Sequence, residues 1–349
     1  MPEVSSAGAT QVGFRAYLWQ FKSGVVAAAA AESAGVAGFG LGDGSIALRV
    51  FAEPEAPSTR RLIAHPDAAL LCLAASPDGK GFLSGGDDGK LMLTTVAGEG
   101  RELAAVPRKW IEHVAVADNG SAIAYSAGKR LGLLNGQDTT RIAVFEDHPS
   151  TVTGIAFNPK GKRLAAAHYG GVSLWWAKAE PQQAKRLAWK GSHVAVTWSP
   201  DGKFIMTATQ ENELHGWRLA DSADMRMSGY PAKPKSFSWS RDGRWLATGG
   251  AEVAVVWDCK GKGPMGSVPV ELNRGALVTH VAFHPRHGLL ASGHADGWLR
   301  LGRLADRSGI ELERIGNGPV TALCWSGDGR YLLAGSEDGA AAILDFGTA

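Results

Sequence analysis

A short turn that ends in glycine recurs along the chain at a nearly constant spacing, and this period limits the possible folds more than any other feature. In the copy formed by residues 199–202, Pro200 fixes φ, Asp201 can bond its own backbone and Gly202 tolerates a positive φ. Successive turn glycines are 41, 41, 41, 41, 45 and 41 residues apart, and they are Gly79, Gly120, Gly161, Gly202, Gly243, Gly288 and Gly329. Such a period indicates a repeat structure.

Each turn lies between runs of residues that favour β-strands. Around Gly202 we expect strands at residues 194–198, 204–208 and 214–218, followed by a more variable fourth strand. Stacked helical repeats are excluded because these runs are short, β-branched or interrupted by Gly, and the turns beside them end helices. A period just above forty residues, with four short strands in each unit, is typical of the blades of a β-propeller.

The number of units follows from the ends of the repeat. An eighth unit precedes Gly79, because residues 35–46 match residues 82–91. The last unit ends on a third strand at residues 340–346, and residues 12–19 form a β-like run without a unit of their own. We therefore predict an all-β, closed propeller of eight four-stranded blades, in which the N-terminal strand completes the last blade. Seven blades would result if the weakly marked first unit were discounted.

The composition agrees with one propeller domain at residues 12–349, preceded by a flexible tail at residues 1–11. Hydrophobic residues make up 45% of the chain and charged residues 20%, as in ordinary globular proteins. A net charge of +2 does not favour nucleic-acid binding, which is kept as one alternative function. The three cysteines lie far apart, and no apolar run reaches the length of a transmembrane helix, so we expect a cytoplasmic protein without a membrane partner.

The repeated Ser-Pro-Asp-Gly-Lys turn, the Leu-Ala-Thr-Gly-Gly run at residues 246–250 and the pair Trp257-Asp258 together resemble the WD-repeat family. In that family a buried network joins a His before the first strand, a Ser or Thr in the second, the Asp of the following turn and a Trp in the third. The resemblance implies that the second unit supplies His65, Ser84 and Asp88, with Thr94 at the Trp position. Other units supply further members of this structural network, namely Asp43, Asp296, Asp338, Trp257 and Asp258.

Aromatic residues also recur at the end of the first strand of a unit, directly before the turn. Trp198, Trp239 and Trp325 occupy this position. A large ring that recurs at this place in several units is best explained by packing between neighbouring blades.

Few side chains in the sequence form a pattern typical of metal binding or catalysis. The densest set of ligand-type side chains consists of His280, His284, His287 and His294, but only His284 and His287 are expected on the same turn. Two ligands fall short of the three or four protein ligands of a zinc site, so we predict no metal and no cofactor. We also expect no enzymatic activity, because neither a Gly-x-Ser-x-Gly elbow nor a phosphate-binding loop is found. A metal-binding or enzymatic function of residues 280–294 is kept as an alternative.

We therefore predict that the functional residues lie on surface loops. In WD-repeat proteins ligands usually dock on the face where the connections between units meet the turns between the second and third strands, and loops vary while the blades hold them rigid. We expect this face to bind a protein or peptide, with an acidic segment favoured by its positive charge. The predicted partner-binding residues are Arg108, Lys109, Trp110, Tyr169, Trp189, Lys190, Lys233, Lys235 and Arg274.

Overall fold

The computed structural model describes residues 13–56, 59–179 and 182–347, and within them the chain is almost entirely β-strand. The only helical segment of these described ranges is one turn of 3-10 helix, η1 (Glu32–Ala34). The tail expected at residues 1–11, and Val12 at the start of the expected first strand, lie outside the described residues.

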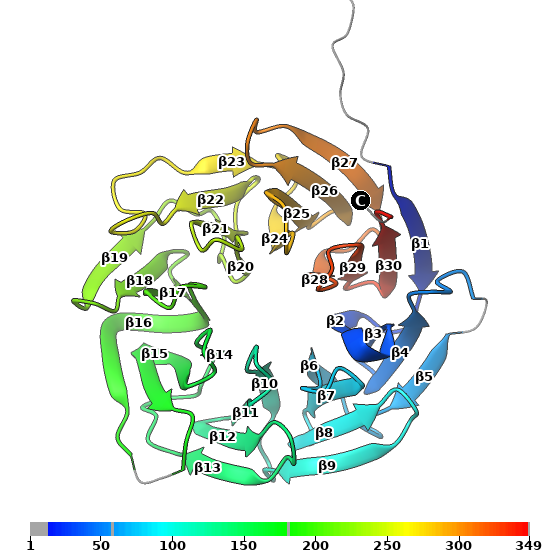
Figure 1. Cartoon of the computed structure of the whole chain (residues 1–349), viewed down its shortest axis with the longest axis horizontal. Coiled ribbons are helices and arrows are strands. Elements are labelled where there is room, and N and C mark those ends of the chain that lie inside the picture. The colour runs from blue at the N-terminus through cyan, green and yellow to red at the C-terminus, as the bar shows by residue number, and fades with distance from the viewer. Residues whose placement is uncertain (1–12, 57–58, 180–181, 348–349) are drawn as a thin grey trace, which may run out of the picture.

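Neighbouring strands pair antiparallel in seven hydrogen-bonded sheets, which Figure 1 shows arranged around a central axis. Six of the sheets have four strands. The first three along the chain are β2 (Val25–Ala31), β3 (Val36–Leu41), β4 (Ser45–Val50) and β5 (Arg60–Ile63); β6 (Leu70–Ala75), β7 (Gly81–Gly86), β8 (Lys90–Thr95) and β9 (Gly100–Ala105); and β10 (Ile111–Val116), β11 (Ala122–Ala127), β12 (Arg130–Asn135) and β13 (Arg141–Phe145). The last three are β20 (Phe237–Trp239), β21 (Trp245–Thr248), β22 (Ala254–Asp258) and β23 (Val270–Leu272); β24 (Val278–Phe283), β25 (Leu289–His294), β26 (Trp298–Arg303) and β27 (Gly309–Arg314); and β28 (Val320–Trp325), β29 (Tyr331–Ser336) and β30 (Ala340–Asp345) with β1 (Arg15–Gln20). The prediction of an all-β propeller with four-stranded blades is confirmed.

The remaining sheet has six strands and corrects the predicted blade count. It contains β14 (Gly154–Phe157), β15 (Arg163–Trp176), β16 (Lys185–Trp198), β17 (Phe204–Thr209), β18 (Leu214–Arg218) and β19 (Ala223–Met227). The first part of β16 pairs with β15 and its second part pairs with β17. Residues 189–192, which the sequence assigns to a loop between units, continue this strand, and Gly191 bends it with a φ of 120°. The described residues therefore form seven sheets, and the eight separate blades that the sequence predicts are not observed among them.

The weakly marked first unit forms a complete sheet, β2 to β5, so the lower number of sheets does not arise from this unit. Strand β1 lies at the outer edge of the sheet that contains β28 to β30, and it pairs in register with β30 from Arg15 opposite Asp345 to Gln20 opposite Ala340. The two ends of the chain thus share one sheet, as Figure 1 shows. This is the pairing expected of the N-terminal strand.

Apolar side chains fill the spaces between adjacent sheets. Phe82 of β7 is fully buried and packs against Ile46 and Leu48 of the preceding sheet. The recurring Trp at the end of the innermost strand adds a polar link between units. The Nε1 of Trp198 donates to the carbonyl oxygen of Ala156 at 3.0 Å, and Trp325 donates to Ala282 at 3.1 Å. The predicted packing of these rings between units is confirmed.

Candidate functional site

One face of the propeller gathers the connections from each outermost strand to the next innermost strand, together with the turns between second and third strands; we call it the loop face. The two kinds of loop are bonded to each other. The N–H of Val106 donates to the carbonyl oxygen of Gly89 at 2.8 Å, and that of Ile315 donates to Gly297 at 3.0 Å. Side chains on these loops are therefore presented by rigid elements.

The predicted residues between β9 and β10 lie exposed on the loop face. Arg108 and Lys109 are exposed, and the side chain of Trp110 is 59% exposed although it is large and apolar. Tyr169, at the turn inside β15, is 57% exposed, and its N–H donates to the Ser150 hydroxyl at 2.8 Å. These side chains are free to contact a partner.

Trp189 and Lys190 fall inside β16 rather than on a separate loop. Lys190 is exposed, but the Trp189 ring stacks on the ring of the buried His215 with centroids 3.9 Å apart. Trp189 therefore belongs to the packing of its sheet, and its assignment to an open contact surface has no support in this geometry.

Lys233 and Lys235 line a cavity of about 570 Å³ on the loop face, which we call the lysine cavity. Its other lining side chains are mainly apolar and include Phe237, Leu277 and Val320. The two lysines are exposed, and neither forms an ion pair with a carboxylate in the described part of the chain. Burial lowers the pKa of His280, which also lines the cavity, so this ring adds no charge at neutral pH.

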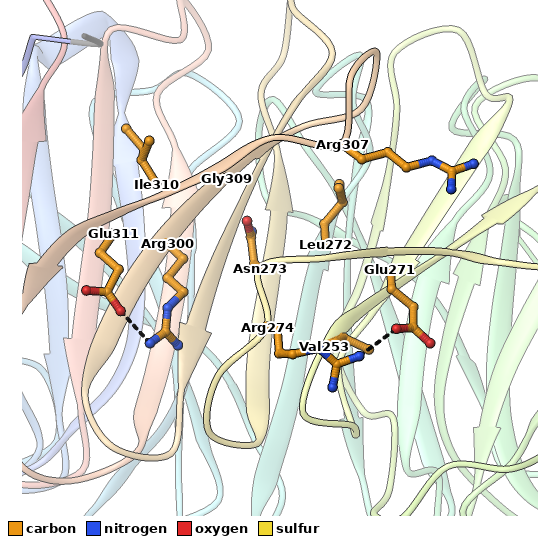
Figure 2. A pocket seen from close by; sticks show the side chains of 10 residues that line it. All are labelled: Val253, Glu271, Leu272, Asn273, Arg274, Arg300, Arg307, Gly309, Ile310 and Glu311. Carbon is orange, nitrogen blue, oxygen red and sulfur yellow. Dashed lines mark hydrogen bonds and ion pairs between the residues drawn. The ribbon is translucent and has the colours of Figure 1, made fainter. Parts of the chain in front are cut away.

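Arg274 does not join the lysine cavity. It lines a second cavity of about 370 Å³ on the flank of the propeller, between β23 and β27, which Figure 2 shows and which we call the flank cavity. Its guanidinium pairs with Glu271 at 2.7 Å. The nine predicted residues thus do not form one continuous patch.

The structural network implied by the family resemblance is present in the second unit. The Nδ1 of His65 lies 3.1 Å from Asp88, and its Nε2 lies 2.9 Å from the Ser84 hydroxyl. Because a carboxylate only accepts, Nδ1–H donates to Asp88 and Nε2 accepts from Ser84. Thr94, at the Trp position, is buried and its hydroxyl has no partner within the described residues.

Two equivalent networks escaped the sequence analysis. Trp257 donates through Nε1 to the Tyr230 hydroxyl at 2.7 Å, and Tyr230 in turn bonds Thr248 at 2.7 Å. Trp175 donates to Nε2 of His148 at 3.0 Å. His65, His148 and Tyr230 lie 14, 13 and 13 residues before their turn glycines. This nearly constant offset is a sequence signal from which the two further networks could be predicted.

The other predicted network residues make local contacts. Asp43 accepts from the Ser45 hydroxyl at 2.6 Å, Asp296 accepts from the N–H of Trp298 at 3.3 Å, and Asp338 accepts from the N–H of Asn317 at 2.8 Å. Asp258 lies at the surface and pairs with Arg244 at 2.7 Å. His65, Ser84 and Asp88, and separately Trp257, are thus joined to other side chains in networks, while Asp43 and Asp338 each accept from the hydroxyl of a buried serine, Ser45 and Ser336.

Replacing Tyr230 with Phe is expected to lower the free energy of unfolding by about 1–3 kcal/mol, because the buried N–H of Trp257 would lose its acceptor. Denaturant unfolding of the wild-type and variant proteins measures the loss. Tyr169→Phe is the matched control, since that ring is exposed. Equal stability of the Tyr230→Phe variant and the wild type would show that the network contributes nothing.

The four histidines of the alternative metal site are held apart by structural bonds. His280 Nδ1 donates to the carbonyl oxygen of Val320 at 2.9 Å, and His294 Nδ1 donates to that of Ala276 at 2.7 Å. The rings of His284 and His287 alone lie together, with centroids 4.7 Å apart, as the sequence indicated. Within residues 13–56, 59–179 and 182–347, no group of three or more His, Cys, Asp or Glu side chains could hold a metal ion.

Comparisons with known proteins agree with this architecture. The family model "WD domain, G-beta repeat" matches residues 57–94 and 139–175, and the model "Anaphase-promoting complex subunit 4 WD40 domain" matches residues 281–349. The crystal structure of the computationally designed Ika8 protein is similar, with a TM-score of 0.76 and 16% identity over 93% of this chain and 97% of that one. No helix in the described part of the chain has the length and apolar character needed to cross a membrane. Propellers with WD repeats generally serve as scaffolds for protein interactions. The matched repeats and the ring of sheets together show that this chain is a WD-repeat β-propeller.

Proposed function

We propose that this propeller is a non-catalytic scaffold that binds a protein or peptide on its loop face, with the lysine cavity as the anchoring point. One observation carries the proposal: a mainly apolar cavity of about 570 Å³ lies beside two lysines. Pockets of this size bind ligands through apolar walls and a few polar groups. The cavity can thus accept one apolar side chain of a partner.

Charge favours an acidic partner segment. Among the described residues that line the cavity, only Lys233 and Lys235 carry a formal charge at neutral pH. Since neither is paired within the described chain, a partner carboxylate would meet an ammonium group without displacing an internal one. Complementary charge raises the rate of association and selects against basic partners.

Further contacts are available on the same face. Trp110 and Tyr169 present large exposed rings, and Arg108 and Lys109 lie beside Trp110. Trp, Tyr and Arg are the residue types that dominate binding energy in protein interfaces. A partner longer than a short peptide would contact these residues as well.

The proposal is tested by selecting peptides from a displayed random library on the purified protein. Peptides that combine Asp or Glu with an apolar residue should be enriched. Lys233→Glu combined with Lys235→Glu should weaken their binding about tenfold or more, as measured by fluorescence polarisation. Lys160→Glu with Lys162→Glu is the matched control, because these exposed lysines have the same spacing on the opposite face.

Equal binding of the selected peptides to the wild type and the folded Lys233→Glu/Lys235→Glu variant would remove the lysine cavity from the proposal. If neither that variant nor a Trp110→Ala/Lys109→Glu variant weakened binding, the loop face as a whole would be rejected. Circular dichroism establishes that each variant is folded.

We further propose that residues 12–349 form one domain. The pairing of β1 with β30, which joins strands far apart in the sequence in one sheet, supports this. We also propose a cytoplasmic location. The free state of Cys72, Cys259 and Cys324 is compatible with a reducing compartment.

A further inference from the structure

The lysine cavity lies where one unit departs from the repeat. Its innermost strand, β20, has three residues, whereas β10 and β28 have six. Thr321, eight residues before its turn glycine, donates through its hydroxyl to the carbonyl oxygen of Val25 in the next sheet, and Thr153 bonds His193 in the same way. Lys235 occupies the equivalent position ahead of β20, and its exposed side chain makes no such bond with the described residues.

One nitrogen of His280 is an open hydrogen-bond acceptor in the wall of this cavity. Its Nδ1–H donates to the carbonyl oxygen of Val320 at 2.9 Å, so Nε2 carries no proton in the neutral ring. Burial lowers the pKa of His280 and keeps the ring neutral at pH 7. Nε2 has no hydrogen-bond partner among the described residues, and it remains accessible to solvent.

The threonine hydroxyls that line the cavity have no proton left for a ligand. The Thr279 hydroxyl donates to the carbonyl oxygen of Val320 at 2.7 Å, and the Thr321 hydroxyl donates to a backbone carbonyl of the next sheet. Each hydroxyl has a single proton, so both groups can only accept from a further partner. Of the described lining hydroxyls, only that of Ser236 keeps an unused proton, since its oxygen accepts from the N–H of Val281 at 3.0 Å.

A purely apolar anchor would match the walls of the cavity but leave its acceptors unbonded. Phe237 and Leu277 offer an apolar lining. A Phe or Leu of the partner would displace water from Nε2 of His280 without replacing its hydrogen bond, and such a loss lowers affinity. A phenol ring keeps the apolar contact and brings a proton. Its oxygen also accepts, unlike an indole N–H, and so suits a wall that includes the Ser236 hydroxyl.

We infer that the side chain anchored in the lysine cavity is a tyrosine, flanked in the partner by Asp or Glu. Its ring packs against Phe237 and Leu277, and its hydroxyl donates to Nε2 of His280. The ammonium groups of Lys233 and Lys235 meet the flanking carboxylates. This inference rests on the proposed binding at the loop face, and it names the residue that the site selects.

The test uses the tightest peptide from the displayed library, labelled with a fluorophore and synthesised with Tyr, Phe or Trp at the position where Ala costs the most affinity. By fluorescence polarisation, the Tyr peptide should bind the wild-type protein about tenfold more tightly than the Phe peptide. In His280→Leu, which lacks the acceptor, this difference should disappear. His113→Leu is the matched control, because His113 has the corresponding position in β10 and does not line the cavity. Circular dichroism establishes that both variants are folded.

A preference for Tyr that is lost in His280→Leu and kept in His113→Leu supports the tyrosine site. Equal affinities of the Tyr and Phe peptides for the wild type, or tighter binding of the Trp peptide, overturn the inference without recourse to any variant. A preference for Tyr that persists in the folded His280→Leu variant overturns it as well. In each of these cases the loop-face proposal survives if affinity still falls in the Lys233→Glu/Lys235→Glu variant, so the two proposals can fail separately.

Discussion

Removal of β1 is expected to lower the free energy of unfolding by more than about 3 kcal/mol, the typical cost of losing one large core side chain. A chain that begins at Lys22 would lack β1. Its strand β30 would then have no partner on that side and would become an exposed sheet edge. It would also lose Trp19, whose ring packs near Phe39 and under the Arg49 guanidinium. We expect the shortened protein to be aggregation-prone and to unfold at lower denaturant concentration.

A synthetic peptide of residues 13–21 should restore stability to the shortened chain when added in excess, because the pairing with β30 needs no covalent link to β2. Within the intact chain, Trp19→Ala should be clearly destabilising, whereas Leu18→Ala should have little effect because Leu18 is 46% exposed. If the shortened chain unfolds like the wild type without the peptide, β1 does not contribute to stability.

Most of the fold could be predicted because each repeat unit indicates the same order of strands and turns. The strands expected at residues 204–208 and 214–218 correspond to β17 (Phe204–Thr209) and β18 (Leu214–Arg218). The N-terminal strand could be placed because the last unit lacked a fourth strand. Both inferences rest on comparing units and do not require any single motif to be strong.

The six-stranded sheet could not be predicted, because its cause is local. Residues 189–192 have the composition of the other connections between units, yet the strand continues through them, since Ala188 pairs with Gly171 and Ser192 pairs with Tyr169. Gly191 is compatible with either a loop or a bent strand. In this segment the ring of Trp189 stacks on the ring of His215. The two residues are 26 positions apart, and their contact has no sequence signature.

The candidate sites were predicted less completely than the fold. Periodicity places a residue on the loop face, but it does not show which loops lie next to each other. Arg274 was therefore grouped with Lys233 and Lys235, although it lines a different cavity. The walls of the flank cavity combine Arg274, which follows β23, with Arg300 of β26, and this neighbourhood has no signature in the sequence.

Phe82→Ala is expected to lower the free energy of unfolding by about 3–5 kcal/mol, more than the loss expected for Tyr230→Phe. The side chain of Phe82 is fully buried and fills the space between two sheets, so its removal leaves a cavity lined by Ile46 and Leu48. Denaturant unfolding measures both variants. The larger loss would show that packing between sheets stabilises this propeller more than its polar network does.

Gly38 provides an internal control for this interpretation, because a Cβ at residue 38 would lie 2.5 Å from the ring of Phe82. Gly38→Ala should be destabilising by about 1–3 kcal/mol in the wild type, where the added methyl group would overpack the interface. In the Phe82→Ala background the same change should cost much less, since the methyl group would enter the cavity left by the ring. Additive effects in this double-mutant cycle would mean that the two residues are not packed together, and the account of the interface between these sheets would then be wrong.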